Sequence, residues 1–171
     1  MTPEEIYREL IKHSQIEWVE GAKLPVTSAT SGDPFLVVPA AKILEIAKVL
    51  KTREEFSFDC LSSLTAVDRF ANQRFEVVYH LFSYKHRHNV TLKIYLERGD
   101  TAHLSTVESL WGCANWFERE VYDLFGIKFD QHSDLRRIML PDDWVGHPLR
   151  KDYKEQEDYH GIATTRPPLI Q

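Results

Sequence analysis

Residues 105–126 read STVESLWGCANWFEREVYDLFG, and the interpretation of the rest of the chain depends on this stretch. Ser105 followed three residues later by Glu108 has the spacing of a capping box, in which each side chain accepts a hydrogen bond from a free backbone N–H. Apolar residues recur at the three- and four-residue steps of one buried helical stripe: they are Val107, Leu110, Trp111, Ala114, Phe117, Val121 and Leu124. Gly126 stands where a left-handed cap would end a helix. The pattern therefore predicts one helix of about five turns that begins at Thr106 and ends at Gly126.

The polar face of this predicted helix carries many charges near its end. Glu118, Arg119, Glu120 and Asp123 fall in the last two turns, and Arg119 and Asp123 are four residues apart and can pair. A carboxylate near a helix C-terminus faces the negative end of the helix dipole. We therefore expect the three carboxylates to pair with arginines, the alternative being an ordinary solvated face. The candidate donors are Arg136, Arg137 and arginines of a partner chain.

The residues around and after Gly126 carry a family signature. It consists of Glu118-Arg119-Glu120, Asp123, Leu124-Phe125, His132, Arg136, Ile138 and Met139, followed by the run WVGHPLRKDY from Trp144 to Tyr153. Together these residues resemble the 30-kilodalton subunit of respiratory complex I, which is also called the C or J subunit of NADH-quinone oxidoreductases. One departure is Ser133, where family members usually carry proline, and it predicts a looser local turn.

The resemblance implies a subunit without catalytic residues in a proton-translocating NADH:quinone oxidoreductase. It implies no cofactor in this chain, because FMN, the iron–sulfur clusters and quinone would bind to other chains. The expected partners are the 49-kilodalton (D) subunit near the quinone site and also the B and I subunits, at the cytoplasmic side of the cell membrane. The same subunit in a ferredoxin-dependent or F420H2-dependent complex, or in a membrane-bound hydrogenase, is the alternative. The residues expected at the partner interface are Glu118, Arg119, Glu120, Asp123, His132, Arg136, Arg137, Trp144, His147, Arg150, Lys151, Asp152 and Tyr153.

Composition limits the class of protein. The chain has 171 residues, of which 43% are hydrophobic and 12% aromatic, enough for one domain with a core. The net charge of −5 offers no basic stripe for nucleic acid and no polybasic patch for a membrane surface. No apolar run approaches the roughly 20 residues that span a bilayer, and we expect a soluble chain.

Other site types have little support in the sequence. Cys60 and Cys113 are far apart and lack ligand spacing, so two small buried side chains are the favoured interpretation. His86 and His88 fall in a predicted hairpin loop, and there is no phosphate-binding glycine motif. An acid–base site is the enzymatic alternative, but no nucleophile or cofactor motif accompanies it. Its residues would be Glu118, Glu120, Asp123 and His132.

The remaining pattern predicts an α+β body over residues 1–130. Capping residues and helical spacing predict helices over 3–13 and 40–52. The predicted strands cover residues 16–20, 35–38, about 58–67 with a bulge near 62–63, 75–82 and 90–97, and the predicted loops cover 21–33 and 85–89. The strand 75–82 is apolar on both faces and should be central, whereas 90–97 should lie nearer an edge. This order gives a mainly antiparallel sheet with helices packed on it.

Residues 131–171 are predicted to form an extended, irregular C-terminal tail. Prolines and glycines interrupt every period there, yet the segment is too apolar to stay free in water. Such a segment needs a surface to lie on, and we expect it to wrap a partner chain. Folding back on its own body as a surface loop is the alternative, chiefly for Arg136 and Arg137.

Overall fold

The fold is seen in a computed structural model, which describes residues 1–13 and 35–164. The predicted strand at 16–20 and loop at 21–33 lie outside these residues. At the N-terminus the predicted helix is confirmed as α1 (Pro3–His13). Its capping box forms as expected, because the Thr2 N–H donates to Glu5 Oε2 at 2.7 Å and the Glu5 N–H donates to Thr2 Oγ1 at 3.3 Å.

A sheet of four strands forms the centre of the molecule. Its order is β1 (Leu36–Val37), β4 (His88–Glu97), β3 (Arg74–Ser83), β2 (Cys60–Arg69). The three long strands are antiparallel and β1 is parallel to β4, so the mainly antiparallel α+β fold is confirmed. The strand β3 is interior as expected, and β4 lies beside the short edge strand β1. The register of β2 shifts between Leu61 and Ser63, where the bulge was predicted.

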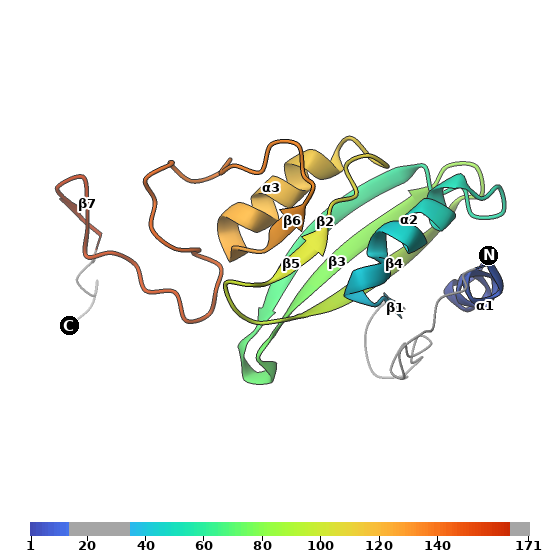
Figure 1. Ribbon diagram of the computed structural model, residues 1–171, viewed down its shortest axis with the longest axis horizontal. Helices are drawn as coiled ribbons and strands as arrows, with labels where there is room; N and C mark the ends of the chain where they lie inside the picture. Colours follow the sequence, from blue (N-terminus) through green and yellow to red (C-terminus); the bar gives the residue numbers. More distant parts are fainter. Residues whose placement is uncertain (14–34, 165–171) are drawn as a thin grey trace, which may run out of the picture.

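Helices cover this sheet, and a short 3-10 turn leads into one of them. Pro39 ends β1 and is followed by the 3-10 turn η1 (Ala40–Lys42) and then by α2 (Ile43–Thr52). The inward face of α2 is fully buried, as its apolar spacing requires. Helix α1 packs on α2, and α3 (Ala114–Phe125) packs on β2. Figure 1 shows α1 at one end of the molecule and the C-terminal segment at the other.

The predicted helix from Thr106 to Gly126 is wrong in its first half. Residues 103–105 form the short strand β5 (His103–Ser105), which pairs in parallel with β6 (Lys128–Asp130), and only α3 is helical. The Thr106 N–H donates to the carbonyl of Asp130 at 3.1 Å, and the Val107 N–H donates to Glu118 Oε1 at 2.8 Å. The Glu108 N–H, which the capping box would have paired with Ser105, donates instead to Thr106 Oγ1 at 3.1 Å, and the Glu108 carboxylate accepts from the Ser133 N–H. Gly126 does end the helix, with φ of 75°.

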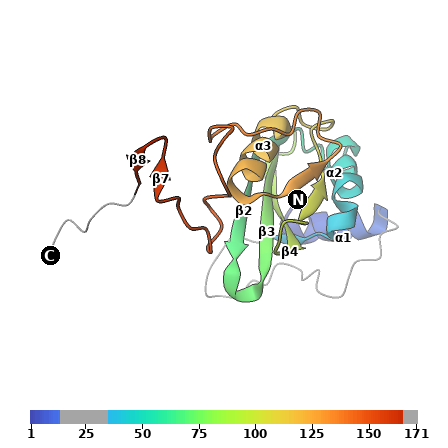
Figure 2. The same ribbon diagram turned by 60° about the vertical axis from the view of Figure 1, so that its left-hand side comes forward.

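Two further expectations are corrected by the structure. Cys60 is partly exposed and Cys113 is exposed, because the first begins the edge strand β2 and the second immediately precedes α3. The C-terminal segment is irregular over most of its length but ends in a small antiparallel hairpin of β7 (Asp158–Tyr159) and β8 (Ile162–Ala163). Figure 2 shows this hairpin standing away from the body. Within the described residues, none of the helices has the length and apolarity to cross a bilayer.

Candidate functional site

The candidate site is the junction between α3 and residues 131–152, which we call the helix–tail junction. Its centre is Asp123, whose side chain is fully buried. One carboxylate oxygen accepts from Arg137 Nη1 at 2.6 Å. The other accepts from the N–H groups of Ile138, Met139 and Leu140 at 2.8–3.0 Å. Burial alone would raise the pKa of Asp123, but these N–H donors and the Arg137 guanidinium outweigh it and hold the pKa below its ordinary value. A single ionised carboxylate therefore fixes the course of the tail.

Two arginines complete this anchor by donating to backbone carbonyls. Arg137 Nη2 reaches the carbonyls of Trp144 and Gly146 at 3.1 and 3.0 Å, so one side chain holds two bends of the tail. Arg119 donates in the other direction, from α3 to the carbonyls of Arg136 and Arg137 at 3.2 and 3.3 Å. The predicted pair of Arg119 with Asp123 is therefore wrong, because the tail offers each of them a better oriented partner.

A second buried cluster lies nearer the start of α3 and involves Glu118, Glu108 and His132. Glu118 is fully buried and accepts from the Thr106 hydroxyl and from the Val107 N–H. The His132 side chain is also fully buried, with Nε2 at 3.6 Å from Glu108 and 3.8 Å from Glu118. Its Nδ1 accepts from the Asp134 N–H at 3.0 Å, so the ring proton is on Nε2, which donates to the carbonyl of Asn115 at 3.1 Å.

The two carboxylates of this cluster differ in their environments. Burial raises the pKa of Glu118 to about 7, against the hydrogen bonds from Thr106 and Val107, and the nearby Glu108 adds to the rise. Glu108 is also partly desolvated, but hydrogen bonds from Asn115 and Ser133 hold its pKa below the ordinary value. Glu108 therefore carries the charge near neutral pH, and Glu118 titrates there.

Ser133 is tied to this cluster. Its N–H donates to Glu108 Oε1 at 2.8 Å and its hydroxyl donates to Glu108 Oε2 at 3.1 Å. A proline has no N–H and could make neither bond. The looser turn expected at this departure from the family pattern is therefore wrong, because the serine makes its own attachment.

The far end of the junction is held by His147 and Arg150. Arg150 Nε donates to the carbonyl of Phe125 at 2.7 Å and Nη1 pairs with Asp100 at 2.6 Å. His147 Nδ1 lies 2.9 Å from the carbonyl of Asp123, and burial and the nearby cations lower its pKa, so the neutral ring donates to that carbonyl. Both side chains lie against Gly126, where an added Cβ would come within 2.5 Å of each. A glycine at this position thus serves both the left-handed cap and the close approach of the tail.

The tail is also attached to the sheet. Asp68 on β2 is buried and pairs with Arg98 at 3.0 Å, and its other oxygen accepts from the Lys151 N–H at 2.8 Å. Asp152 in turn pairs with Arg98, and the two carboxylates together raise the pKa of the guanidinium. The buried charge on β2 thus receives donors from both the body and the tail.

The structure therefore brings most of the expected interface residues onto the chain's own body. The hypothesis that the helix carboxylates pair with arginines is confirmed for Asp123, but it is wrong for Glu118, whose partners are Thr106 and Val107. Glu120 is exposed, and no cation pairs with it within the described residues. Arg136 is exposed, and its one ion pair in the described part of the chain is with neighbouring Asp134. Sequence reasoning missed Asp68, Arg98 and Asp100, which are distant from the tail in the chain. It gave Glu108 a capping role, whereas the structure pairs this residue with Ser133.

The outer side of the tail carries three large apolar side chains among exposed charged residues such as Asp142, Asp143 and Lys151. Met139, Val145 and Leu149 are 64%, 63% and 48% exposed, respectively. Three buried polar atoms of the tail also have no hydrogen-bond partner within the described residues. They are Trp144 Nε1, Arg150 Nη2 and Tyr153 Oη. The same part of the chain contains no cluster of side chains suited to hold a metal ion.

Comparison with known proteins assigns a family to this architecture. The model for the 30 kDa subunit of respiratory-chain NADH dehydrogenase matches residues 36–159. The chain belongs to this family. It is 43% identical over 136 residues to the C subunit of the NADH-quinone oxidoreductase of Geobacter sulfurreducens, and the match covers 76% of this chain and 82% of that protein. The corresponding C subunit of Moorella thermoacetica is 45% identical over 125 residues, which are 73% of this chain and 82% of that protein.

One solved structure contains a chain with the same fold as this member of the 30 kDa subunit family. The structure is that of the membrane-bound sulfane sulfur reductase, an archaeal respiratory membrane complex, and its chain matches with a TM-score of 0.71 and 27% sequence identity. The match covers 88% of this chain and 85% of that chain. The helix–tail junction lies within the segment that the family model matches.

Proposed function

We propose that the chain is a scaffold subunit, without catalytic residues, in the peripheral arm of a proton-translocating NADH:quinone oxidoreductase. In that role FMN, the iron–sulfur clusters and quinone bind to other chains, and this chain positions its neighbours. Membership of the family and the names of its relatives support the assignment.

The observation that carries the proposal is the state of the tail. Ion pairs and carbonyl contacts fix its backbone to α3, so its course is set before any partner arrives. Its outer side exposes Met139, Val145 and Leu149 among charged residues, a mixed surface of the kind found at protein–protein interfaces. A prearranged segment binds with a smaller loss of conformational entropy.

The partner we propose for this surface is the 49-kilodalton (D) subunit near the quinone site, with the B and I subunits also in contact. The three unpartnered polar atoms of Trp144, Arg150 and Tyr153 are groups that such a contact, or water at its edge, would satisfy. The assembled complex would hold the chain at the cytoplasmic side of the cell membrane.

A related complex is the second candidate, and one observation favours keeping it. The sulfane sulfur reductase contains a chain of the same fold at 27% identity. The fold therefore occurs in a membrane complex whose name includes no NADH or quinone. NADH-dependent quinone reduction by the complex purified through this chain distinguishes the two.

The test uses the full-length tagged chain expressed in its own cells. Replacing the exposed Val145 and Leu149 by glutamate places charge on the outer side of the tail and leaves every side chain that anchors the tail to α3 in place. We expect the free variant to unfold at the wild-type temperature and the amount of assembled complex to fall by at least about tenfold. Leu44→Glu, on the exposed side of α2, is the matched control.

The rate of quinone reduction per assembled complex distinguishes a scaffold role from a catalytic role. The few complexes that the double variant forms should reduce quinone at the wild-type rate per complex. Full assembly with lost quinone reduction would instead make the tail part of the quinone or proton path. Failure of the tagged wild-type chain to purify with any subunit of an NADH-quinone oxidoreductase would overturn the proposal.

A further inference from the structure

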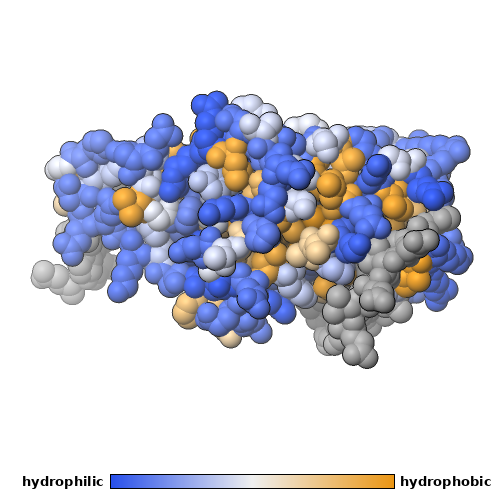
Figure 3. Space-filling view, viewed as in Figure 1, coloured by the Kyte–Doolittle hydropathy of each residue, from blue (hydrophilic) through white to orange (hydrophobic). Residues whose placement is uncertain are grey.

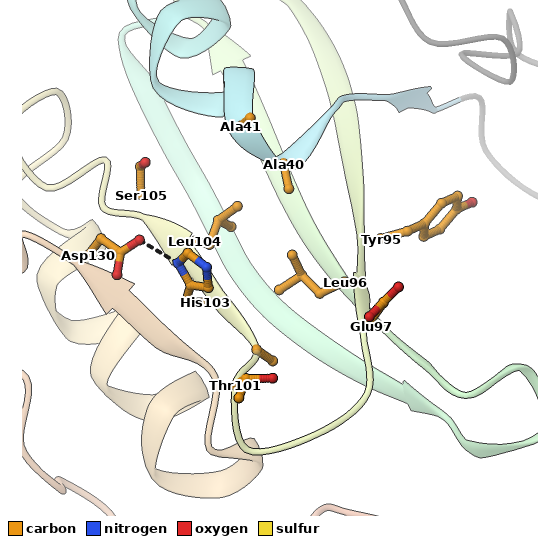
Figure 4. A pocket seen from close by; sticks show the side chains of 11 residues that line it. Ala40, Ala41, Tyr95, Leu96, Glu97, Thr101, His103, Leu104, Ser105 and Asp130 are labelled. Carbon is orange, nitrogen blue, oxygen red and sulfur yellow. Dashed lines mark hydrogen bonds and ion pairs between the residues drawn. The ribbon is translucent and has the colours of Figure 1, made fainter.

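A second surface lies on the other side of β5, away from the helix–tail junction. Strand β4 runs toward Glu97, the chain turns through residues 98–102, and β5 returns alongside it without pairing. Between them lies a cavity of about 420 Å³. Figure 4 shows Tyr95 and Glu97 on one wall, His103 and Ser105 on the other, and Ala40 and Ala41 of η1 at one end. We call this cavity the β4–β5 slot.

Among the residues that the structure describes, part of the β4 backbone presents unpaired hydrogen-bonding groups to the slot. The Lys93 carbonyl accepts from the Val38 N–H at 2.9 Å, so the peptide groups of Lys93 point away from β3. Peptide groups alternate in direction along an antiparallel strand. Those of Tyr95 and Glu97, two and four residues further along, therefore point the same way. Strand β1 ends at Val37 and does not reach them.

The backbone of β5 presents the matching groups from the opposite wall. The Ala102 carbonyl accepts from the Lys128 N–H, and the Thr106 N–H donates to the Asp130 carbonyl, so the peptide groups of even-numbered residues face β6. Those of His103 and Ser105 consequently face the slot. Within the described residues, no strand pairs with the slot-facing edge of β4 past the end of β1, and none pairs with the slot-facing edge of β5.

Side chains give the slot an apolar floor and an acidic rim. Leu96 and Leu104 are buried beneath it. Figure 3 shows apolar side chains gathered over the middle of this face of the molecule. Glu97 and Asp130 are exposed at the rim, and the lining includes no lysine or arginine. The only cationic group that the lining can offer is His103, whose Nδ1 is 2.6 Å from Asp130.

We infer that the β4–β5 slot binds a short extended segment of another subunit, which adds a strand between β4 and β5 and carries a lysine or arginine toward Glu97. An extended chain satisfies unpaired edge groups on both of its sides, and here both walls offer them over three residues. The apolar floor accepts alternate side chains of that strand, and the acidic rim selects a basic one. This inference rests on the proposed function, because the segment belongs to a subunit of the same complex.

Hydrogen–deuterium exchange with residue-level fragmentation tests the slot in the free chain and in the complex purified through it. In the free chain, the amides of Tyr95, Glu97, His103 and Ser105 should exchange fast, whereas those of Ile94 and Leu96, which face β3, should be slow. In the complex, we expect the four slot amides to slow by at least about tenfold. Glu97→Lys should remove most of that protection, and Glu4→Lys, on exposed α1, should leave it intact.

Each other outcome overturns the inference. If the slot amides exchange fast in a complex that contains all its subunits, the slot binds no segment in that complex. The proposed function is unaffected by that result. Slow exchange in the free chain means that the slot is filled by this chain or a second copy of it. Protection that survives Glu97→Lys excludes a basic occupant. A wild-type chain that purifies with no partner ends both proposals together.

Discussion

The sheet and the tail of this molecule are held by different forces. In the sheet, Phe75, Val77, Leu92 and Ile94 have no exposed surface, and packing of such side chains supplies the stability. Taken as whole residues, none between 131 and 164 is buried, and the tail is fixed by directional bonds to Asp123, Phe125 and Asp68. Burial is cooperative across a core, whereas each polar anchor can fail separately. The two regions should therefore respond to different substitutions.

The largest effect is expected in the sheet. Leu92→Ala removes a fully buried side chain from β4 and should lower the free energy of unfolding by about 2–5 kcal/mol. Urea unfolding measures it, with Thr91→Val as the control on the half-buried face of the same strand. The free energy of local opening measured from exchange of the tail amides should not change, because the tail opens without unfolding the sheet. Release of the tail by this substitution would contradict the separation of the two regions.

The next effect depends on pH and tests the Glu118 cluster. Burial raises the pKa of Glu118 from 4.5 to about 7, so between these values the folded chain holds a proton that the unfolded chain has lost. The stability that comes from this raised pKa is fully present below pH 4.5 and is lost as the pH rises to about 7. Glu118→Gln removes this dependence, and the difference between wild type and variant should change by up to roughly 3 kcal/mol between about pH 4.5 and 8.

Unfolding of both proteins across that pH range checks this prediction. The variant difference is required because Glu108, His132 and Tyr79 face Glu118 and other groups titrate as well. Glu120→Gln, exposed on the same helix, should run parallel to the wild type. Parallel curves for Glu118→Gln would show that the buried carboxylate does not titrate in this range.

Asp123→Asn tests the central anchor of the tail. It leaves Arg137 without its anionic partner and turns one acceptor into a donor that faces N–H groups. Breaking a buried pair is costly, but here the tail can open and let water reach Arg137. We therefore expect the free energy of local opening of the tail to fall by about 2 kcal/mol. The amides of residues 138–140 should exchange about thirtyfold faster while the unfolding midpoint changes less. Equal loss in both measurements would mean that the tail and the body open together.

Gly126→Ala sharpens the same comparison at the end of α3. A side chain at φ of 75° costs about 1–2 kcal/mol, and its Cβ would displace His147 and Arg150. Gly112→Ala is a matched control because nothing lies within 4 Å of its added Cβ. Thermal unfolding of both variants should separate them. Equal unfolding midpoints would show that neither the strained φ nor the displacement of His147 and Arg150 lowers the stability.

The smallest effect is expected at Ser133. Ser133→Pro removes both bonds to Glu108 but stiffens the unfolded chain, and the opposing contributions should leave less than about 1 kcal/mol of destabilisation. Ser133→Ala keeps the N–H and separates the hydroxyl from the backbone bond. Thermal unfolding of the two variants gives the difference. A strongly destabilised proline variant would mean that the serine N–H fixes the whole turn.

Local patterns predicted the body well and the site only in part. Alternation in 75–82 and 90–97 specified two paired strands, and Thr2 and Glu5 specified the first helix. The same capping pattern failed at Ser105 because the chain there is an extended strand paired in parallel with residues 128–130, and the Glu108 carboxylate bonds to Ser133 instead. The pairing of Arg137 with Asp123 was predictable from the charges at a helix end. The roles of Asp68 and Asp100 were not, because only the folded sheet brings them to the tail.

The spacing of the tail anchors also sets an order of assembly within the chain. Arg137 and Asp123 are 14 residues apart, so this pair closes a short loop as soon as α3 exists. The bond from Lys151 to Asp68 spans 83 residues and needs the finished sheet. The entropy lost on closing a loop grows only slowly with its length, and each anchor shortens the free segment before the next. During synthesis the tail can therefore dock stepwise, from Arg137 outward, onto a body that is already complete.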